Sequence, residues 1–324
     1  MQIVRGVRNL AEKPVRPVVT LGNFDGVHIG HQVIFSKVIA KAGETGGTSV
    51  VYTFDPHPLK ILAPEQSPNL LTTFKKKMEL IAACGIDMTI CADFNRSFAL
   101  MHPRDFALKL KNGLAMESVY VGHDYSFGQA KAGTIDYLKK MGEEMGFAVE
   151  VVDAVNVDGQ RVSSSAIRNL VGEGDVGGAA KRLGRLYSIA GKVVSGHRRG
   201  KAIGFPTANI ETPYEVIPAV GVYAVFARLG RGEWFEGVVN VGYNPTFNRD
   251  DLIVEAHLID HDEDLYGGEM EIYFAGRLRD EKKFSGVEEL KAQIASDIGA
   301  ARSILLDVRN SGAVIDPVAE TGLK

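Results

Sequence analysis

The sequence predicts two domains, a doubly wound α/β sheet followed by a small antiparallel β-barrel with a C-terminal helix. Apolar runs alternate with amphipathic segments from residue 17 to about 152, which is typical of strands covered by helices. From Tyr187 on, apolar runs are separated by turn residues and no long helix interrupts them. A chain of 324 residues is long enough for both domains, and we place their boundary near residue 185, giving domains 1–185 and 186–324.

The first domain contains five short apolar runs that predict strands buried on both faces, and four longer segments with apolar residues at helical spacing. The predicted strands are VVTLG, SVVYTF, IDMTICADF, SVYVG and AVEVV. The predicted helices are HQVIFSKVIAKAG, TFKKKMELIAAC, PRDFALKLKNG and TIDYLKKMGEEMG. The alternation indicates a parallel sheet. A glycine-rich GEGDVGG segment then breaks one helical pattern, and a short second helix ends at Gly184.

The second domain is predicted from apolar runs bounded by Gly, Pro, Asn and Asp. These runs are YSIAGKVVSG, GVYAVFARL, WFEGVVNVG, LIVEAHLID and EMEIYFAGRL. They indicate a small antiparallel barrel. A late segment, VEELKAQIASDIGAARSILLDVRN, repeats apolar residues at the spacing of one helix face and predicts the closing helix.

Composition limits the classes of partner. The formal net charge is −3, from 37 basic and 40 acidic side chains, so no overall positive field attracts nucleic acid. The two cysteines, Cys84 and Cys91, lack the spacing of a zinc site or a disulfide framework. The N-terminus does not resemble a signal peptide, and no window reaches the roughly 18 apolar residues that span a bilayer. We therefore expect a cytoplasmic protein that binds neither nucleic acid nor membrane.

The stretch GNFDGVHIGH follows the first predicted strand of the sheet. A helix that begins near Gly30 would bring its unpaired N–H groups and positive dipole end to the sheet edge, which suits a phosphate. His28 and His31 are three residues apart, so both rings can reach one anion if the helix begins between them. Two alternatives are capping histidines and a metal site, but Asp25 alone leaves metal coordination incomplete.

Three further segments of the first domain supply groups that such phosphate chemistry needs. TFDPHP follows the second strand, and its prolines fix a loop. VGHDYSFGQAKAG follows the fourth strand and carries Asp124 at its start. VSSSAIR places Ser163, Ser164 and Ser165 at a helix start with Arg168 in its first two turns, a second anion site. The alternatives are an N-cap for the serines and a surface ion pair for Arg168.

In the second domain, SGHRRGKAIGFPTANI is a glycine-bounded basic segment that can wrap phosphates. Thr207 and Asn209 within it offer a hydroxyl and an amide oxygen, both suited to Mg²⁺, although a plain barrel turn would also explain Pro206 and Asn209. Glu255 interrupts the apolar strand LIVEAHLID and is a candidate general base. Alternatively, Glu255 lies on the solvent face of a half-exposed strand. The alternation of apolar and polar residues does not distinguish a general base from such a surface residue.

In order along the chain, ten motifs resemble those of the bacterial bifunctional riboflavin kinase/FMN adenylyltransferase family, also called FAD synthetase. They are GNFDGVHIGHQ, TFDPHP, VGHDYSFG, VSSSAIR, GFPTANI, GVYAV, NVGYNPTF, VEAHLID, DLYG and LRDEKKF. The resemblance implies a nucleotidyltransferase-type Rossmann-like domain and a six-stranded kinase barrel. It further implies that the barrel phosphorylates riboflavin with ATP to give FMN, that the first domain transfers AMP from ATP to FMN to give FAD and pyrophosphate, and that both steps use Mg²⁺.

The resemblance also assigns residues. The positions that match the family's ATP- and flavin-binding residues in the first domain are Asn23, His28, His31, Asp124, Ser163, Ser164 and Arg168. In such HxGH motifs the two histidines support charge that grows on the α-phosphate of ATP. Thr207 and Asn209 match the residues that hold Mg²⁺ and phosphate, and Glu255 matches the proposed catalytic base.

The sequence departs from the family's pattern at two places. Ser165 stands where the motif usually has Thr, and Lys201 and Ala202 precede GFPTAN where Arg is more usual; neither change removes a catalytic group. Two other hypotheses remain at this point. One is an enzyme with a single active domain, and the other is a non-catalytic flavin or nucleotide sensor that uses the same pockets.

Overall fold

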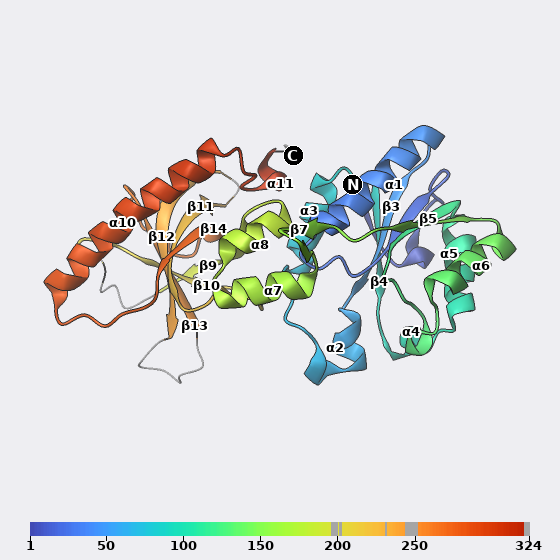
Figure 1. Ribbon diagram of the computed structural model, residues 1–324, viewed down its shortest axis with the longest axis horizontal. Coiled ribbons are helices and arrows are strands. Elements are labelled where there is room, and N and C mark those ends of the chain that lie inside the picture. The colour runs from blue at the N-terminus through green and yellow to red at the C-terminus, as the bar shows by residue number, and fades with distance from the viewer. Residues whose placement is uncertain (196–199, 201–202, 231, 244–251, 321–324) are drawn as a thin grey trace. The chain divides into compact units, whose positions relative to one another are not determined.

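The computed structural model describes residues 1–195, 200, 203–230, 232–243 and 252–320 (Figure 1). The chain forms two compact units, Met1–Ser163 together with the residues from Val318 on, and Ser164–Pro317. This grouping divides the chain at Ser163, before the boundary predicted near residue 185. Whether the functional domains divide at residue 185 stays a prediction.

The first unit is built on a six-stranded sheet in the order β1-β4-β3-β2-β5-β6, in which every neighbouring pair is parallel. The predicted parallel sheet is confirmed. Its strands are β1 (Gln2–Arg5), β2 (Val18–Leu21), β3 (Ser49–Asp55), β4 (Met88–Asp93), β5 (Ser118–Gly122) and β6 (Ala148–Val152). β1 was not predicted, because it has four residues and only Val4 is buried. A two-stranded hairpin, β7 (Asn156–Val157) and β8 (Gln160–Arg161), follows the sheet.

Helices cover both faces of this sheet. They are α1 (Ile29–Thr45), α2 (Pro58–Leu62), α3 (Phe74–Ala83), α4 (Arg96–Ala99), α5 (Pro103–Leu114) and α6 (Ile135–Met145). Successive residues of β2 pack on opposite sides: Val18 lies in one core with Phe35 of α1, whereas Val19 lies in a second core with Leu110 of α5. This alternation is the reason the strands read as continuous apolar runs.

The second unit is a closed six-stranded barrel in the order β10-β13-β12-β11-β14-β9, and its neighbouring strands pair antiparallel. Its strands are β9 (Tyr187–Val194), β10 (Ala208–Glu211), β11 (Gly221–Leu229), β12 (Trp234–Tyr243), β13 (Leu252–Leu258) and β14 (Glu269–Arg279). The six-stranded barrel is confirmed. β10 was not predicted as a strand, because the sequence analysis treated its residues as part of the segment SGHRRGKAIGFPTANI.

Helices α7 (Ser164–Glu173) and α8 (Val176–Leu183) precede the barrel, and α10 (Val287–Asn310) and α11 (Pro317–Glu320) follow it. The break between α7 and α8, the end of α8 at Gly184 and the span of α10 are as predicted. α10 lies along the barrel in Figure 1, and its Ala301 and Leu305 are fully buried with Val222 and Phe226 of β11. The hydrophobic effect therefore holds the helix against the outside of the barrel.

A buried charge network joins the segment after α10 to the barrel. Arg228 makes ion pairs of 2.9 Å with Glu271 and 2.8 Å with Asp316. Tyr273 donates a hydrogen bond of 2.7 Å to Asp316, and burial raises the pKa of this phenol, so the proton stays on the donor. Arg228 is shared by two carboxylates, so its removal would take the ion-pair partner from both Glu271 and Asp316.

Candidate functional site

The loop between β2 and α1 carries the HxGH motif of the first unit. β2 ends at Leu21 and α1 begins at Ile29, so the helix begins between His28 and His31 as the phosphate hypothesis requires. Phe24 and Val27 are buried in the loop although both have positive φ angles, of 51° and 41°. Asn23 is exposed at the start of the loop.

His28 is the N-cap of α1. Its Nδ1 accepts a hydrogen bond of 3.4 Å from the backbone N–H of His31, so in this tautomer the ring proton is on Nε2. The two imidazoles stack with their centroids 3.5 Å apart, and the ring of Phe24 meets His31 edge-on at 5.2 Å. The capping alternative is therefore present in the structure. Because capping uses only Nδ1, the Nε2–H group can still donate a hydrogen bond to an anion.

The other predicted residues of the nucleotide site lie on three segments. Asp124 is exposed just beyond β5 and pairs with Arg161 at 2.5 Å. Ser163 immediately precedes α7, Ser164 is its first residue, and Arg168 donates a hydrogen bond of 3.2 Å to Ser165 within the helix. Ser163 belongs to the first unit, whereas Ser164 and Arg168 belong to the second. Their joint role with the histidines stays a prediction.

The second unit contains a cavity of about 1060 Å³ that the three predicted kinase residues line. Thr207 lies just before β10, Asn209 lies on β10 and Glu255 lies on β13. Asn209 and Glu255 are partners in the β10–β13 register. The alternation of β13 is as expected, with Val254, Ala256 and Leu258 buried and the Glu255 face less so. That face lines the cavity.

Two polar residues of the same wall were not assigned a site role from the sequence. Asn240 of β12 is the register partner of Glu255 on its other side and also lines the cavity. His257, two residues beyond Glu255 on the same face, binds the carbonyl oxygen of Pro206 through Nδ1 at 2.8 Å. Because a carbonyl only accepts, Nδ1 carries the proton, and the contact fixes the segment that leads to Thr207. The alternation of β13 was the available signal for His257, and the motif NVGYNPTF, which begins at Asn240, was the signal for Asn240.

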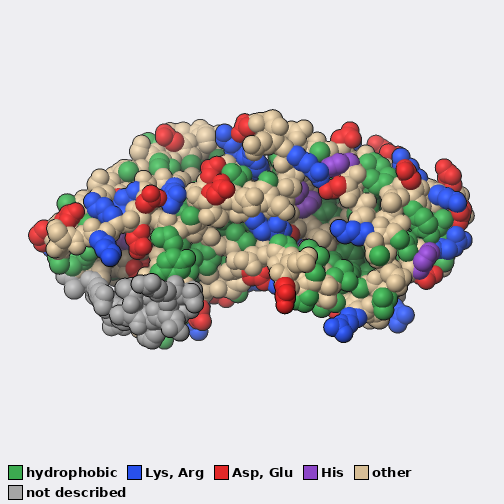
Figure 2. Space-filling model, turned by 60° about the horizontal axis from the view of Figure 1, so that its bottom comes forward, with side chains coloured by type: hydrophobic (Ala, Val, Ile, Leu, Met, Phe, Trp, Pro, Cys, Tyr) green, Lys and Arg blue, Asp and Glu red, His purple; other side chains and the backbone are tan. Residues whose placement is uncertain are grey.

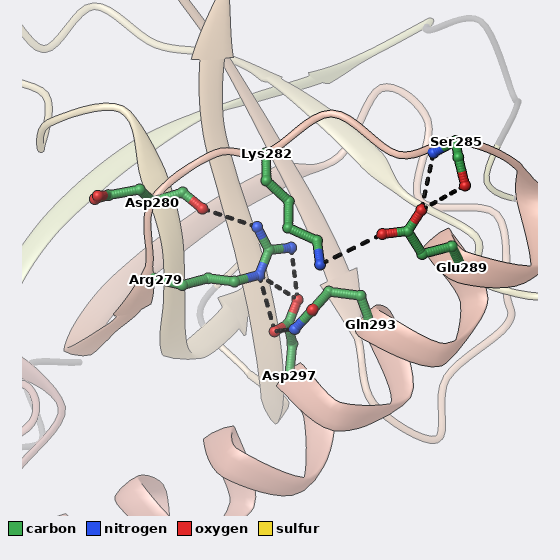
Figure 3. A network of polar contacts seen from close by, with 7 residues as sticks. All are labelled: Arg279, Asp280, Lys282, Ser285, Glu289, Gln293 and Asp297. Carbon is green, nitrogen blue, oxygen red and sulfur yellow. Dashed lines mark hydrogen bonds and ion pairs between the residues drawn. The ribbon is translucent and has the colours of Figure 1, made fainter.

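The opposite part of the cavity is formed by α10 and the segment before it. Leu290 and Ile294 contribute apolar surface. Arg279, at the end of β14, makes three hydrogen bonds to the carboxylate of Asp297 on α10: Nε at 3.0 and 3.1 Å and Nη2 at 2.8 Å (Figure 3). Gln293 donates a further one of 2.8 Å. This pair joins the helix to the barrel at the cavity.

A metal site was predicted at Thr207 and Asn209. In the part of the chain that the structure describes, there is no cluster of three His, Cys, Asp or Glu residues that could hold a metal ion. The hydroxyl, amide and carboxylate oxygens of Thr207, Asn209 and Glu255 share one cavity, and such a hard oxygen set fits Mg²⁺ better than a transition metal. The residues therefore fit the expected ion.

The described residues cover two of the sequence motifs only in part. The basic residues 197–199 and 201, and residues 244–248 of NVGYNPTFN, lie outside the described residues. Over the face drawn in Figure 2, described Lys and Arg side chains are interspersed with Asp and Glu. Within the described chain, no helix is both long and apolar enough to cross a membrane.

Comparison with known proteins assigns the two units to two domain families. The FAD synthetase model matches residues 10–166, and the riboflavin kinase model matches residues 183–305. The chain belongs to the family of bifunctional riboflavin kinase/FMN adenylyltransferases. It is 36% identical over 306 residues to the member from Pseudomonas fluorescens, covering 94% of this chain and 98% of that one.

A second relative, from Haemophilus influenzae, is 36% identical over 304 residues and covers 94% of this chain and 99% of its own. Among solved structures, a chain from Streptococcus pneumoniae described as a macrolide-efflux protein superimposes with a TM-score of 0.84 at 29% identity, covering 93% of this chain and 98% of that one. The similarity thus extends over both units in sequence and in structure.

Proposed function

We propose that the barrel unit phosphorylates riboflavin with ATP to give FMN, and that the α/β unit transfers AMP from a second ATP to FMN to give FAD. The family assignment of both units supports the pair of activities. The observation that carries the residue assignment is the convergence of Thr207, Asn209 and Glu255 on one cavity. Its volume, about 1060 Å³, is at the upper end of the range of small-molecule sites.

In the kinase step, Glu255 is proposed to accept the proton of the ribityl 5′-hydroxyl as its oxygen attacks the γ-phosphorus of ATP. Thr207 and Asn209 are proposed to hold Mg²⁺, which supplies charge neutralisation on the phosphates when bound. Asn209 and Asn240 are the register partners of Glu255 on its two sides in the sheet. Because phosphoryl transfer needs little covalent help, positioning and charge provide most of the rate.

In the adenylyl step, a phosphate oxygen of FMN attacks the α-phosphorus of ATP and the bond to pyrophosphate breaks. His28 and His31 are proposed to donate hydrogen bonds to the α-phosphate, with Asn23 and Asp124 contacting nucleotide or flavin. Ser163, Ser164 and Arg168 are proposed to bind the phosphates that leave. The dipole of α1 begins at His28 and adds positive potential there.

The kinase assignment is tested with Glu255→Gln, which keeps the size of the side chain and removes the base. FMN formation should fall at least about 100-fold, the usual contribution of a general base, while the conversion of supplied FMN to FAD continues. Both products are measured by chromatography of one preparation. FMN formation at the parental rate would remove Glu255 from the mechanism.

The adenylyl assignment is tested with His28→Asn and the double variant His28→Ala/His31→Ala. Asparagine is a good N-cap, so His28→Asn keeps the capping contact and loses the imidazole. If the histidine acts only as a cap, His28→Asn makes FAD at close to the parental rate. If His28 binds ATP, FAD formation falls in both variants and riboflavin phosphorylation serves as the internal control.

The same chromatographic assay separates the rival hypotheses. An enzyme with a single active domain would make FMN from riboflavin but no FAD from FMN, or the reverse, and a sensor would consume no ATP. We also propose a cytoplasmic location, supported by Cys84 and Cys91, which form no disulfide.

A further inference from the structure

The loop that presents the HxGH histidines is held in an unfavourable backbone conformation. Phe24 and Val27 have φ angles of 51° and 41°, a region that costs non-glycine residues on the order of 1–3 kcal/mol each. Their side chains are buried, with exposed fractions of 3% and 1%. Such a conformation persists only where surrounding groups determine it, and two sets of hydrogen bonds attach this loop to its neighbours.

One attachment of the loop is made by Asp25. Its buried carboxylate accepts hydrogen bonds from the backbone N–H groups of Leu71, at 3.1 Å, and Thr72, at 3.3 Å. The hydroxyl of Thr72 in turn accepts one of 3.3 Å from the N–H of Gly26. The middle of the loop is therefore fixed to the segment that leads into α3.

A second attachment is made by Lys77, from α3 itself. Its ammonium donates to the carbonyl oxygen of Asn23, the hydroxyl of Thr53 and the carbonyl oxygen of Phe54, each at 3.3 Å. The Thr53 hydroxyl donates to the same Asn23 carbonyl at 3.2 Å. Lys77 thus joins the start of the GNFDG loop to the start of TFDPHP at the carboxyl ends of β2 and β3.

Keeping the Lys77 ammonium charged at this position costs free energy of desolvation. Burial lowers the pKa of Lys77, and the neighbouring charges of Asp25 and Asp55 favour the protonated form while that of Arg5 opposes it. A residue needed only for packing would not require three acceptors around a cation. The three contacts use all the donors of an ammonium group.

We propose that Lys77 is a positioning residue for adenylyl transfer, which sets the distance between the GNFDG loop and the TFDPHP loop and so places His28 and His31. The inference rests on the proposed function of the histidines. Because misplacement of reacting groups by about 1 Å can cost on the order of 100-fold in rate, losing the attachment should lower the turnover of FMN to FAD more than it weakens FMN binding.

The experiment compares Lys77→Met with Lys75→Met, an exposed lysine two residues earlier on α3, in the full chain. In Lys77→Met, kcat for FMN adenylylation should fall at least about tenfold, with a smaller change in KM for FMN. Riboflavin phosphorylation, measured in the same sample, should not change. Lys75→Met should resemble the parent in both activities. A Lys77→Met enzyme with kcat within twofold of the parent overturns the proposal.

Two further variants keep the test valid if Lys77→Met lowers the folded fraction of the first unit. Lys77→Arg keeps the charge and donors and should recover activity to within about threefold of the parent. Thr53→Val removes one acceptor without changing size and should also lower kcat. Since Lys77 and Thr53 act on one carbonyl, the losses of the double variant should be less than the product of the single losses. Parental activity in Thr53→Val, or multiplicative losses in the double variant, overturns the proposal.

Failure of the positioning role of Lys77 and failure of the proposed histidine roles give different results. If the histidine variants lose FAD formation and Lys77→Met does not, only the positioning role is wrong. If Lys77→Met loses kcat while the histidine variants retain it, the attachment serves Asn23 and the loops, and the histidine roles are wrong.

Discussion

Replacing Asp297 by alanine should destabilise the barrel unit, because it removes the partner of a largely buried arginine. The carboxylate accepts three hydrogen bonds from Arg279 and one from Gln293 (Figure 3). The side chains of Arg279 and Asp297 are 22% and 6% exposed. After the substitution, the guanidinium would remain at the cavity wall with water as its main partner on that side.

The size of the effect follows from the burial of the pair. Breaking a buried ion pair by removing one partner costs about 3–5 kcal/mol. Because about a fifth of the Arg279 side chain is exposed, water offsets part of this, and we expect a loss of about 2–4 kcal/mol in the free energy of unfolding. For a domain of this size, 3 kcal/mol corresponds to about 6–12 °C in Tm.

The single tryptophan of the chain makes the assay specific to the barrel. Trp234 lies on β12 and its ring is 4.9 Å from that of Tyr273, so its fluorescence during urea unfolding reports on the second unit. Arg302→Gln on the same helix is the matched control. It removes an exposed ion pair with Asp260, which should contribute less than about 1 kcal/mol.

A second readout connects stability to function. Leu290 and Ile294 of α10 line the cavity, so loosening the helix should raise KM for riboflavin while the adenylylation of FMN stays unchanged. A loss below about 1 kcal/mol in Asp297→Ala, equal to that of Arg302→Gln, would refute the reasoning that the pair holds the helix.

Two other predictions concern local contacts. The backbone N–H and hydroxyl of Ser285 hold the pKa of Glu289 below its ordinary value; this contribution to stability is complete above the ordinary value and is lost as pH falls through the folded-state value. Ser285→Ala should therefore raise the pKa of Glu289, as followed by NMR titration of the side chain, and an unchanged pKa would contradict the assignment. Gly22→Ala places a Cβ 2.8 Å from the ring of Phe24 and should lower FAD formation while FMN formation remains, whereas equal losses of both would indicate general damage.

Most of the fold could be predicted because its strands and helices carry clear periodicity. The runs around Val19 and Val51 are apolar on both faces, since each face meets a helix layer. The exceptions are short and polar: β1 buries one residue of four, and β10 has a single buried residue, Ile210. Such strands are formed by pairing with distant neighbours, which a local pattern does not contain.

The candidate site was predictable where a motif keeps its residues close in sequence. His28 and His31 are neighbours on one helix turn, and Thr207 and Asn209 are two apart. Asn240 and Lys77 were given no role from the sequence, because each reaches its partners only through sheet register or through a helix that returns to the sheet. The positive φ angles of Phe24 and Val27 had no signal at all, since neither residue type favours that conformation.

The barrel of the second unit has a consequence for how it comes apart. In an open sheet the outermost strand is bonded on one side only and can peel away before its neighbours. Here each of the six strands has a partner on both sides, so the ring of hydrogen bonds has no free edge at which to begin. We therefore expect its amide protons to exchange with solvent in a concerted manner, whereas in the first unit exchange would proceed inward from β1 and β6.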